Sequence, residues 1–568
     1  MTRLSSIVQG IPLGEEPGLG ALTIGGYLRE VTTRYAGREA LVMHTSDGVV
    51  RWSYATLWER SVEVARALRA AGICKGGRVG VLMTNRPEFL ASMFGIALAG
   101  GVTVAFSTFS TTPELKHLLQ VAGVSVLLVE SQVAQKNFAS MLCDIEPAIR
   151  TSKPGQLASV TLPFLRHIVL LEECDGAISI GGCLDTWPAF LALGNATPIG
   201  QIEAAAATVM PADAGVLFFS SGTTSTPKGI LHTQRAVAIQ WWRWVRILDV
   251  KNPVRTWTAN GFFWSGNFSM VIGSTLSIGG TLVLQPTFRA EQALELMQAE
   301  QVNLPLAWPH QWAKLEGAAN FGQIDLSAVR YIDPRTPLGR HPSVTTHWHE
   351  PPAYGTTETL TIVASWLAST ALDARGTSQG EILPGNTLKI VDPVSGVVVP
   401  RGERGEIAVK GPTLMLGYIG IPGDETFDKE GFFRTGDGGY VDEDGRLYWE
   451  GRLTDIIKTG GANVSPLEID AVLVTCPGIK MTRTVGVPHE TLGEVVVACI
   501  VPHAESTVDE RAVRDFLKGH LASYKVPRHV LFFREEDIQM TGSDKVKATA
   551  LIELATTRLQ AYTPDAPT

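Results

Sequence analysis

Most of the chain, up to about residue 430, alternates between helical and strand-like spacing of its apolar positions. One segment repeats apolar residues at helical spacing and then stops at a glycine: Leu57, Val64, Leu68, Ala71 and Gly72. Short apolar runs at 78–83, 124–129 and 166–171 are typical of buried strands. This alternation predicts an α/β fold in which helices are layered on mostly parallel sheets.

The pattern changes near residue 440, where the elements become shorter. Residues 440–449 predict a hairpin, because the acidic and glycine residues at 442–445 favour a tight turn. Strand-like runs follow at 482–487 and 494–501.

A helix is predicted after these strands, and it completes a separate C-terminal unit. Thr507 and Glu510 have the spacing of a capping box. The apolar face of the helix consists of Val513, Phe516, Leu517 and Leu521. We predict a large N-terminal domain of layered α/β subdomains at 1–451, a hinge at 452–455 and a small α+β domain at 456–568.

Composition and charge narrow the class of protein. The chain has 568 residues, of which 45% are hydrophobic and 18% charged, so it can bury large cores. The net charge is −8 and no basic stripe is present, which excludes nucleic acid as the expected partner. The six cysteines form no CxxC pair or zinc spacing, which indicates reduced thiols in a cytoplasmic protein.

One uncharged segment, Phe89 to Phe106, is long enough to raise the question of a membrane span. Gly95 and the pair Gly100–Gly101 interrupt it. We therefore predict a buried helix, a turn and a strand there, and no integral membrane segment.

The segment 214–229, AGVLFFSSGTTSTPKG, carries the clearest chemical signal. An apolar strand runs into glycine and hydroxyl residues, where backbone N–H groups can converge on phosphate oxygens, and a lysine adds charge. The spacing differs from that of a Walker A loop, and the composition alone also fits a flexible polar loop. The candidate phosphate-binding residues are Ser221, Gly222, Thr223, Thr224, Ser225, Thr226 and Lys228.

A second candidate stretch is 353–359, AYGTTET. Tyr354 can stack on a base, Thr357 can bond a phosphate, and Glu358 can hold magnesium, which prefers hard oxygen ligands. By itself, the stretch also fits an exposed loop.

Two further stretches carry side chains that could bind a ribose or neutralise charge that develops during a reaction. Residues 433–437, FRTGD, offer Asp437 to ribose hydroxyls, and Arg452 follows on the C-terminal side. Residues 541–547, TGSDKVK, offer a lysine that can neutralise charge on a transferred phosphoryl group. Read alone, the first is a common turn and the second a surface loop.

Taken in this order, the four stretches resemble those of the adenylate-forming superfamily, which includes acyl-CoA synthetases, peptide-synthetase adenylation domains and firefly-type luciferases. Residues 451–466, 485–494 and 524–527 add further matches. The resemblance implies an N-terminal AMP-binding domain and a mobile C-terminal lid. It also implies an AMP-forming acid–thiol ligase: a carboxylate attacks the α-phosphorus of ATP, pyrophosphate leaves, and the thiol of coenzyme A then attacks the acyl-adenylate.

The resemblance also implies roles for individual residues. The phosphate loop would bind the β- and γ-phosphates of ATP, Thr357 would contact the α-phosphate, and Glu358 would bind Mg²⁺. Tyr354 would lie on adenine, and Asp437 with Arg452 would bind the ribose. Lys545 would bridge the acyl carboxylate and the phosphate in the first step only, because the lid then rotates it away. Gly460 and Gly461 would let the pantetheine arm of coenzyme A pass close to backbone, and Thr454 would be the hinge residue.

The sequence departs from the family pattern in four places. Ser225 replaces a glycine of the phosphate loop, and Asp544 replaces the glycine before the catalytic lysine. Thr454 stands where the hinge residue is usually Asp or Lys. A small-residue loop expected before the second stretch is replaced by 331–339, YIDPRTPLG, which weakens inference about the substrate.

The acid is expected to be hydrophobic. Residues 261–267, GFFWSGN, resemble the segment that gates the acyl pocket, with Trp264 at the gate. Further apolar lining is expected from Phe262, Phe263, Trp308 and Trp312. These aromatics equally fit an ordinary core. We expect a fatty, aromatic or alicyclic acid.

Two other functions remain open at this stage. One is an adenylation enzyme that loads a carrier-protein thiol or an amine. The other is a non-catalytic nucleotide-binding homologue, which Asp544 and Ser225 keep in view. The identity of the acid, the pathway and the formation of a homodimer are also left open by the sequence.

Overall fold

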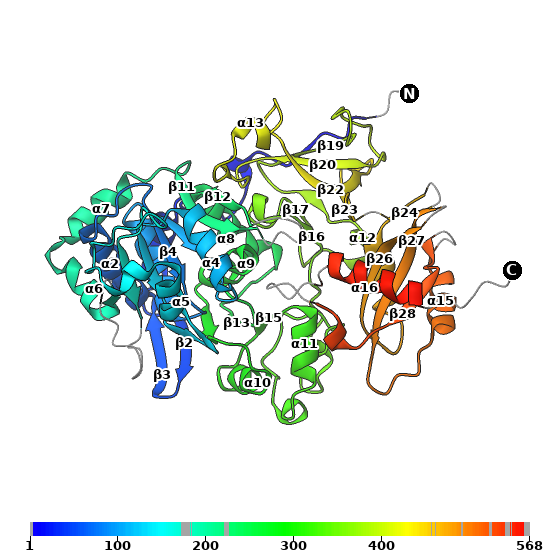
Figure 1. Ribbon diagram of the computed structural model, residues 1–568, viewed down its shortest axis with the longest axis horizontal. Coiled ribbons are helices and arrows are strands. Elements are labelled where there is room, and N and C mark those ends of the chain that lie inside the picture. Colours follow the sequence, from blue (N-terminus) through cyan, green and yellow to red (C-terminus); the bar gives the residue numbers. More distant parts are fainter. Residues whose placement is uncertain are drawn as a thin grey trace.

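The computed structural model describes residues 4–171, 182, 184–220, 227–455, 457–459, 462–489, 492–521, 525–539, 546 and 548–561 (Figure 1). The sheet with the most strands in its N-terminal part has eight. Its strand order is β10-β9-β6-β4-β5-β11-β12-β21. Pairing is parallel from β10 to β11 and antiparallel at β12 and β21. The strands are β4 (Arg78–Leu82), β5 (Val102–Ala105), β6 (Val126–Val129), β9 (His167–Leu170), β10 (Leu184–Thr186), β11 (Ala214–Phe219), β12 (Gly229–Thr233) and β21 (Gly417–Tyr418).

The strands predicted from apolar runs are confirmed as β4, β6 and β9. The uncharged segment forms the buried helix α3 (Pro87–Leu98), a turn at Gly100 with φ of 84°, and β5, also as predicted. Within the part of the chain that the structure describes, every helix is too short or too polar to span a bilayer.

A second sheet, ordered β15-β13-β14-β2-β3, shares a hydrophobic core with the first through a layer of helices. In this layer α8 contacts β11 and β12, α9 contacts β13 and β14, and the two helices contact each other. The elements are β2 (Glu39–Thr45), β3 (Gly48–Ser53), β13 (Arg255–Thr258), β14 (Thr281–Leu284), β15 (Leu304–Leu306), α1 (Ile24–Arg34), α2 (Tyr54–Ala70), α8 (Gln234–Ile247) and α9 (Ser265–Leu276). Further elements are α4 (Thr112–Ala122), α5 (Phe138–Ile145), α6 (Trp187–Leu193), α7 (Ile199–Ala207), α10 (Ala290–Ala299), α11 (Pro309–Glu316), β7 (Gln132–Val133) and β8 (Lys136–Asn137).

A third sheet, ordered β1-β19-β20-β22-β23, lies above these layers in Figure 1. The predicted hairpin is confirmed as the end of β22 and the start of β23, and Gly445 in its turn has φ of 85°. The elements, with those of a small sheet beside it, are β1 (Val8–Gln9), β19 (Thr387–Val391), β20 (Gly405–Lys410), β22 (Phe433–Val441), β23 (Leu447–Arg452), β16 (Ala353–Tyr354), β17 (Ala364–Ser365), β18 (Glu381–Ile382), α12 (Leu372–Arg375) and α13 (Gly423–Thr426).

The C-terminal part has hydrophobic clusters of its own, which draw only on residues from Ile457 onward. The strands predicted there are confirmed within β26 and β27, which pair in an antiparallel register. The elements are β24 (Ile457–Thr459), β25 (Ala462–Val464), α14 (Pro466–Leu473), β26 (Ile479–His489), β27 (Gly493–Pro502), α15 (Glu510–Lys518), β28 (His529–Phe532) and α16 (Ala548–Ala561).

The predicted capping box of the C-terminal helix is wrong. The N-cap of α15 is Asp509, which accepts a hydrogen bond from the backbone N–H of Ala512, and the helix begins at Glu510. Aspartate caps as well as threonine does, and here it stands directly before the first helical residue, so Thr507 lies outside the helix.

A buried ion pair ties the N-terminal segment to the helix layer. Nη2 of Arg243, on α8, is 2.8 Å from Oε2 of Glu16, and both side chains are almost completely buried. The same guanidinium donates to the backbone carbonyl of Pro384, shortly before β19. One cation therefore joins the N-terminal segment, the helix layer and the third sheet.

We expect Glu16→Ala to lower the free energy of unfolding by about 3–5 kcal/mol, because it leaves a buried guanidinium without its anion. The matched control is Glu63→Ala, which removes an exposed pair with Arg60 and should cost less than about 1 kcal/mol. Urea denaturation followed by tryptophan fluorescence measures both. Equal losses of unfolding free energy in the two variants would contradict a stabilising role for the buried Glu16–Arg243 pair.

Candidate active site

A buried carboxylate, that of Asp437, organises one side of the site. Its Oδ2 accepts a hydrogen bond from the Tyr354 hydroxyl at 2.7 Å, and its Oδ1 lies 3.1 Å from Nε of Arg452. Asp437 and Arg452 are directly paired across β22 and β23, so the sheet register itself brings acid and base together. Burial raises the pKa of Asp437, while the Arg452 guanidinium opposes the shift.

Tyr354 is brought to this cluster with its ring buried. Only 4% of its surface is exposed, and its hydroxyl oxygen also lies 3.2 Å from Oγ1 of Thr435. The ring of Trp449 lies 6.2 Å away, centroid to centroid. The hydroxyl thus has the definite structural task of orienting Asp437, which the sequence did not indicate. Its contact with adenine stays a prediction.

A short turn carries the second group of candidates, Thr357 and Glu358. Oε1 of Glu358 accepts a hydrogen bond from the Tyr418 hydroxyl at 2.8 Å. The ammonium of Lys228 lies over the Tyr418 ring, 5.0 Å from its centroid. No motif marked Tyr418, because its position depends on the pairing of β21 with β12. Tyr418 therefore links the end of the phosphate loop to the acidic turn.

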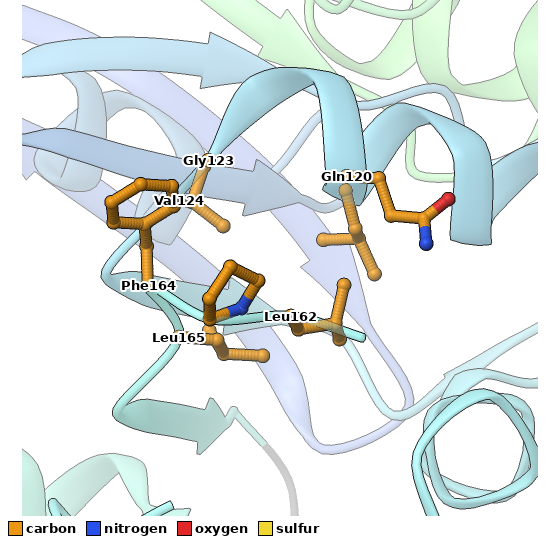
Figure 2. Close-up of a pocket in the computed structure, with 8 residues that line it drawn as sticks. Gln120, Gly123, Val124, Leu162, Phe164 and Leu165 are labelled. Atoms are coloured by element: carbon orange, nitrogen blue, oxygen red, sulfur yellow. The ribbon is translucent and has the colours of Figure 1, made fainter. Parts of the chain in front are cut away.

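Members of both groups line one cavity of about 580 Å³, which is within the usual range for ligand pockets. Its lining includes Lys228, Glu358, Tyr418, Thr435 and Arg452. A separate apolar notch between α4 and residues 162–165 measures about 10 Å³ (Figure 2), room for about one water. The larger cavity is the candidate site, because the sequence-predicted residues Lys228, Glu358 and Arg452 line it.

The side chain of His232 contacts the backbone of the turn that carries Thr357 and Glu358. Its ring is buried, which lowers the pKa of His232 to about 4, so the imidazole is neutral near pH 7. Nε2 lies 2.8 Å from the carbonyl oxygen of Thr357. A carbonyl can only accept, so Nε2 carries the hydrogen. Sequence reasoning missed this residue, because a lone histidine in a strand carries no motif.

Part of the predicted site lies outside the described residues, namely Ser221, Gly222, Thr223, Thr224, Ser225, Thr226, Gly460, Gly461, Asp544 and Lys545. The base of the phosphate loop is described. The backbone N–H of Ser220 donates to the carbonyl of Lys228 at 3.0 Å, and the Lys228 N–H donates to Oγ of Ser220 at 3.0 Å. The antiparallel pairing of β11 with β12 thus joins the two ends of that loop.

The aromatic candidates for the acid pocket fall on two loops. The rings of Phe263 and Trp264 lie 5.2 Å apart, with Phe263 buried and Trp264 half-buried. Trp308 precedes α11, and its backbone N–H donates to Oε1 of Gln311. Nε2 of Gln311 in turn donates to the side-chain oxygen of Asn260 at 2.9 Å. A buried polar bridge therefore connects the two loops.

Phe109 is an aromatic neighbour that the sequence did not single out. Its ring meets that of Phe263 edge-on at 5.8 Å, and 56% of the residue is exposed. Its loop follows β5, at the carboxyl end of a parallel strand, where sites collect in α/β sheets. The ammonium of Lys136 binds the backbone carbonyls of Phe109 and Ser110, which holds the loop in place.

The segment that replaces the expected small-residue loop is an ion-paired turn. Arg335 binds Asp333 through two nitrogens, at 2.8 and 2.7 Å. Burial alone would raise the pKa of Asp333, but the bonds from Arg335 hold it down to about 2. The hinge candidate Thr454 is exposed, and the preceding residue, Leu453, donates its N–H to the carbonyl of Gly436 at 2.8 Å.

The chain is similar in sequence and in fold to known acyl-CoA ligases. The chain is 30% identical to the indoleacetate–CoA ligase of Aromatoleum aromaticum, over 87% of this chain and 91% of that protein. It is 26% identical to the mitochondrial medium-chain acyl-CoA ligase ACSF2 of Danio rerio, over 95% and 89%. The crystal structure of the anthranilate CoA ligase AuaEII in complex with anthranoyl-AMP has the same fold, with a TM-score of 0.76, 23% identity and coverage of 96% of this chain and 99% of that one.

The family match spans most of the molecule. Residues 28–419 match the AMP-binding enzyme family, and residues 468–545 match the AMP-binding enzyme C-terminal domain. The chain therefore belongs to the AMP-binding enzyme family, within the adenylate-forming superfamily, and it is an AMP-forming acid–thiol ligase.

Proposed function

We propose that this ligase activates a hydrophobic carboxylic acid, fatty, aromatic or alicyclic, as its acyl-adenylate and then forms the acyl-CoA thioester. One observation carries the proposal: Arg452, which pairs with the buried Asp437, lines the same cavity as the Glu358–Tyr418–Lys228 group. A ribose and a polyphosphate are the ligand parts that suit these two groups. The aromatic residues Phe263, Trp264 and Trp308 support an apolar acid.

In the first step, the acid's carboxylate oxygen attacks the α-phosphorus of ATP and pyrophosphate leaves. Lys228 and the phosphate loop hold the β- and γ-phosphates, Thr357 contacts the α-phosphate, and Asp437 with Arg452 holds the ribose. Lys545 bridges the carboxylate and the α-phosphate, where its ammonium offsets the charge that develops.

In the second step, the sulfur of coenzyme A attacks the acyl carbonyl, AMP leaves, and the thiol proton is released. We propose that the small domain at 456–568 turns on the 1–451 domain through the hinge at 452–455, centred on Thr454. Gly460 and Gly461 would then border the path of the pantetheine arm. Separate positions for the two steps keep Lys545 away from the incoming thiol.

A magnesium ion fits the acidic turn. The hydroxyl of Tyr418 occupies one oxygen of Glu358 and orients the carboxylate beside the cavity that both residues line. Among the described residues, no group of three or more Asp, Glu, His or Cys could hold a metal alone. Mg²⁺ usually binds through one or two carboxylates together with phosphates and waters, and Glu358 suits that role. When bound, it would neutralise phosphate charge.

Pyrophosphate release with a panel of fatty, aromatic, alicyclic and amino acids tests the proposed substrate class, with and without coenzyme A. We expect release to depend on an apolar acid, and thioester formation to depend on free coenzyme A. A thioester or amide formed only with a carrier protein or an amine would favour the alternative acceptor. No release with any acid would reject the proposal.

We expect Lys545→Ala to reduce acyl-adenylate formation roughly 10²-fold or more while thioester formation from supplied acyl-adenylate continues. The matched control is Lys547→Ala, two residues away in the same segment, which should leave both half-reactions near normal. Rapid-quench assays of each half-reaction measure the effects. Equal loss of both half-reactions in Lys545→Ala would remove the proposed role.

Glu358→Gln keeps the size of the side chain but removes its charge. We expect the magnesium concentration for half-maximal adenylation to rise roughly tenfold or more. Glu425→Gln, on α13 in the lining of the same cavity, should have a much smaller effect. Titration of adenylation with Mg²⁺ measures both. An unchanged magnesium curve for Glu358→Gln would argue against this ligand.

A further inference from the structure

The turn that carries Thr357 and Glu358 is held through its backbone carbonyls by groups from outside it. The carbonyl of Thr357 accepts from Nε2 of His232, which lies on β12. The carbonyl of Glu358 accepts from the backbone N–H of Met415 at 2.8 Å, shortly before β21. A strand of the eight-stranded sheet and the segment that leads into another strand thus both support the turn.

A third support comes from the helix layer. Nε2 of Gln240, on α8, lies 3.4 Å from the carbonyl of Thr359 and 2.8 Å from that of Ile362. The Gln240 side chain is completely buried, as is that of His232. Three consecutive carbonyls, at 357, 358 and 359, are therefore each bound by a donor from a different part of the fold.

The backbone of this turn needs such support. Leu360 and Thr361 have φ of 47° and 83°, in the left-handed region that side chains other than glycine rarely adopt. At Gly355, an added Cβ would lie 1.4 Å from the carbonyl oxygen of Thr361, so the two ends of the turn are in direct contact. Backbone in such conformations persists only where the surroundings fix it.

We propose that His232 and Gln240 are positioning residues for the adenylation step. They fix the turn that presents Thr357 to the α-phosphate and Glu358 to magnesium, without touching either ligand themselves. His232 also stands on β12, which begins at Gly229 directly after Lys228, so one strand carries both the residue that follows Lys228 and a support of the turn. The inference rests on the proposed roles of Thr357 and Glu358.

The expected effect is on rate. A displacement of about 1 Å of a reacting group can cost on the order of 10²-fold, so a loosened turn should lower the rate of adenylation. The acid contacts proposed for Phe263 and Trp264 belong to other elements, and the KM for the acid should therefore change little. The magnesium requirement should rise, because Glu358 lies on the same turn.

The test uses two apolar variants, His232→Leu and Gln240→Leu, and one conservative variant, His232→Gln, which keeps an N–H donor. Gln234→Leu is the matched control. Gln234 is also a buried glutamine of α8, but it bonds the backbone of Ile24 and Ala214 instead of the turn. Each variant is measured for the kcat and KM of adenylation, the magnesium dependence and the thermal midpoint.

We expect Gln240→Leu and His232→Leu to lower the kcat of adenylation roughly tenfold to a hundredfold and to raise the magnesium requirement. His232→Gln should recover most of the rate. Gln234→Leu should lower the thermal midpoint with little change in kcat. The inference is overturned if Gln240→Leu and Gln234→Leu have the same kinetic effect, or if His232→Gln is as impaired as His232→Leu.

Two results distinguish a wrong assignment of the turn from wrong positioning roles. If Glu358→Gln leaves the magnesium curve unchanged, the assignment of the turn itself is wrong. If Glu358→Gln is impaired while His232→Leu and Gln240→Leu have normal kcat, the turn is assigned correctly and the positioning roles are refuted.

Discussion

The side of the site proposed to hold the nucleotide depends on a carboxylate that has been removed from water. Asp437 is 3% exposed, and a charge at that depth is stable only with donors around it. The Tyr354 hydroxyl and the Arg452 guanidinium supply them. Arg452 ends β23, and Leu453 donates its N–H to the carbonyl of Gly436, so the Asp437–Arg452 pair lies directly at the start of the proposed hinge.

On the other side of the cavity, protein contacts also hold the candidate residues in place without a ligand. Glu358 is oriented by Tyr418, and the backbone beneath it is bound by His232 and Gln240. Groups fixed before the substrate arrives need no reorganisation when charge develops, which makes their electrostatic effect large. The fold therefore contributes to the proposed chemistry by holding a strained turn and a buried acid in fixed positions.

The sequence predicted those parts of the fold that depend on local patterns. The apolar runs of β4 and β6 and the hairpin at 440–449 are short-range features, and the structure confirms them. The cap of α15 was not predicted: the spacing of Thr507 and Glu510 fits a capping box, but the helix begins at Glu510 and its N-cap is Asp509.

The candidate site was predictable where it consists of motifs and not where it depends on distant pairing. Asp437 and Arg452 were named from sequence, and the structure brings them together. The bond from Tyr354 to Asp437 spans 83 residues and arises only when separate sheets meet. The contacts of Tyr418 and His232 have the same origin. Such residues carry no local signal, because tertiary packing alone gives them their neighbours.

The proposed chemistry begins when a carboxylate oxygen of the acid attacks the α-phosphorus of ATP. Incubation with an acid whose carboxylate is labelled with oxygen-18, followed by mass spectrometry of the products, tests it most directly. We expect one labelled oxygen in AMP after the acyl group has moved to coenzyme A, and none in pyrophosphate. Label in pyrophosphate or inorganic phosphate, with AMP unlabelled, would contradict the account.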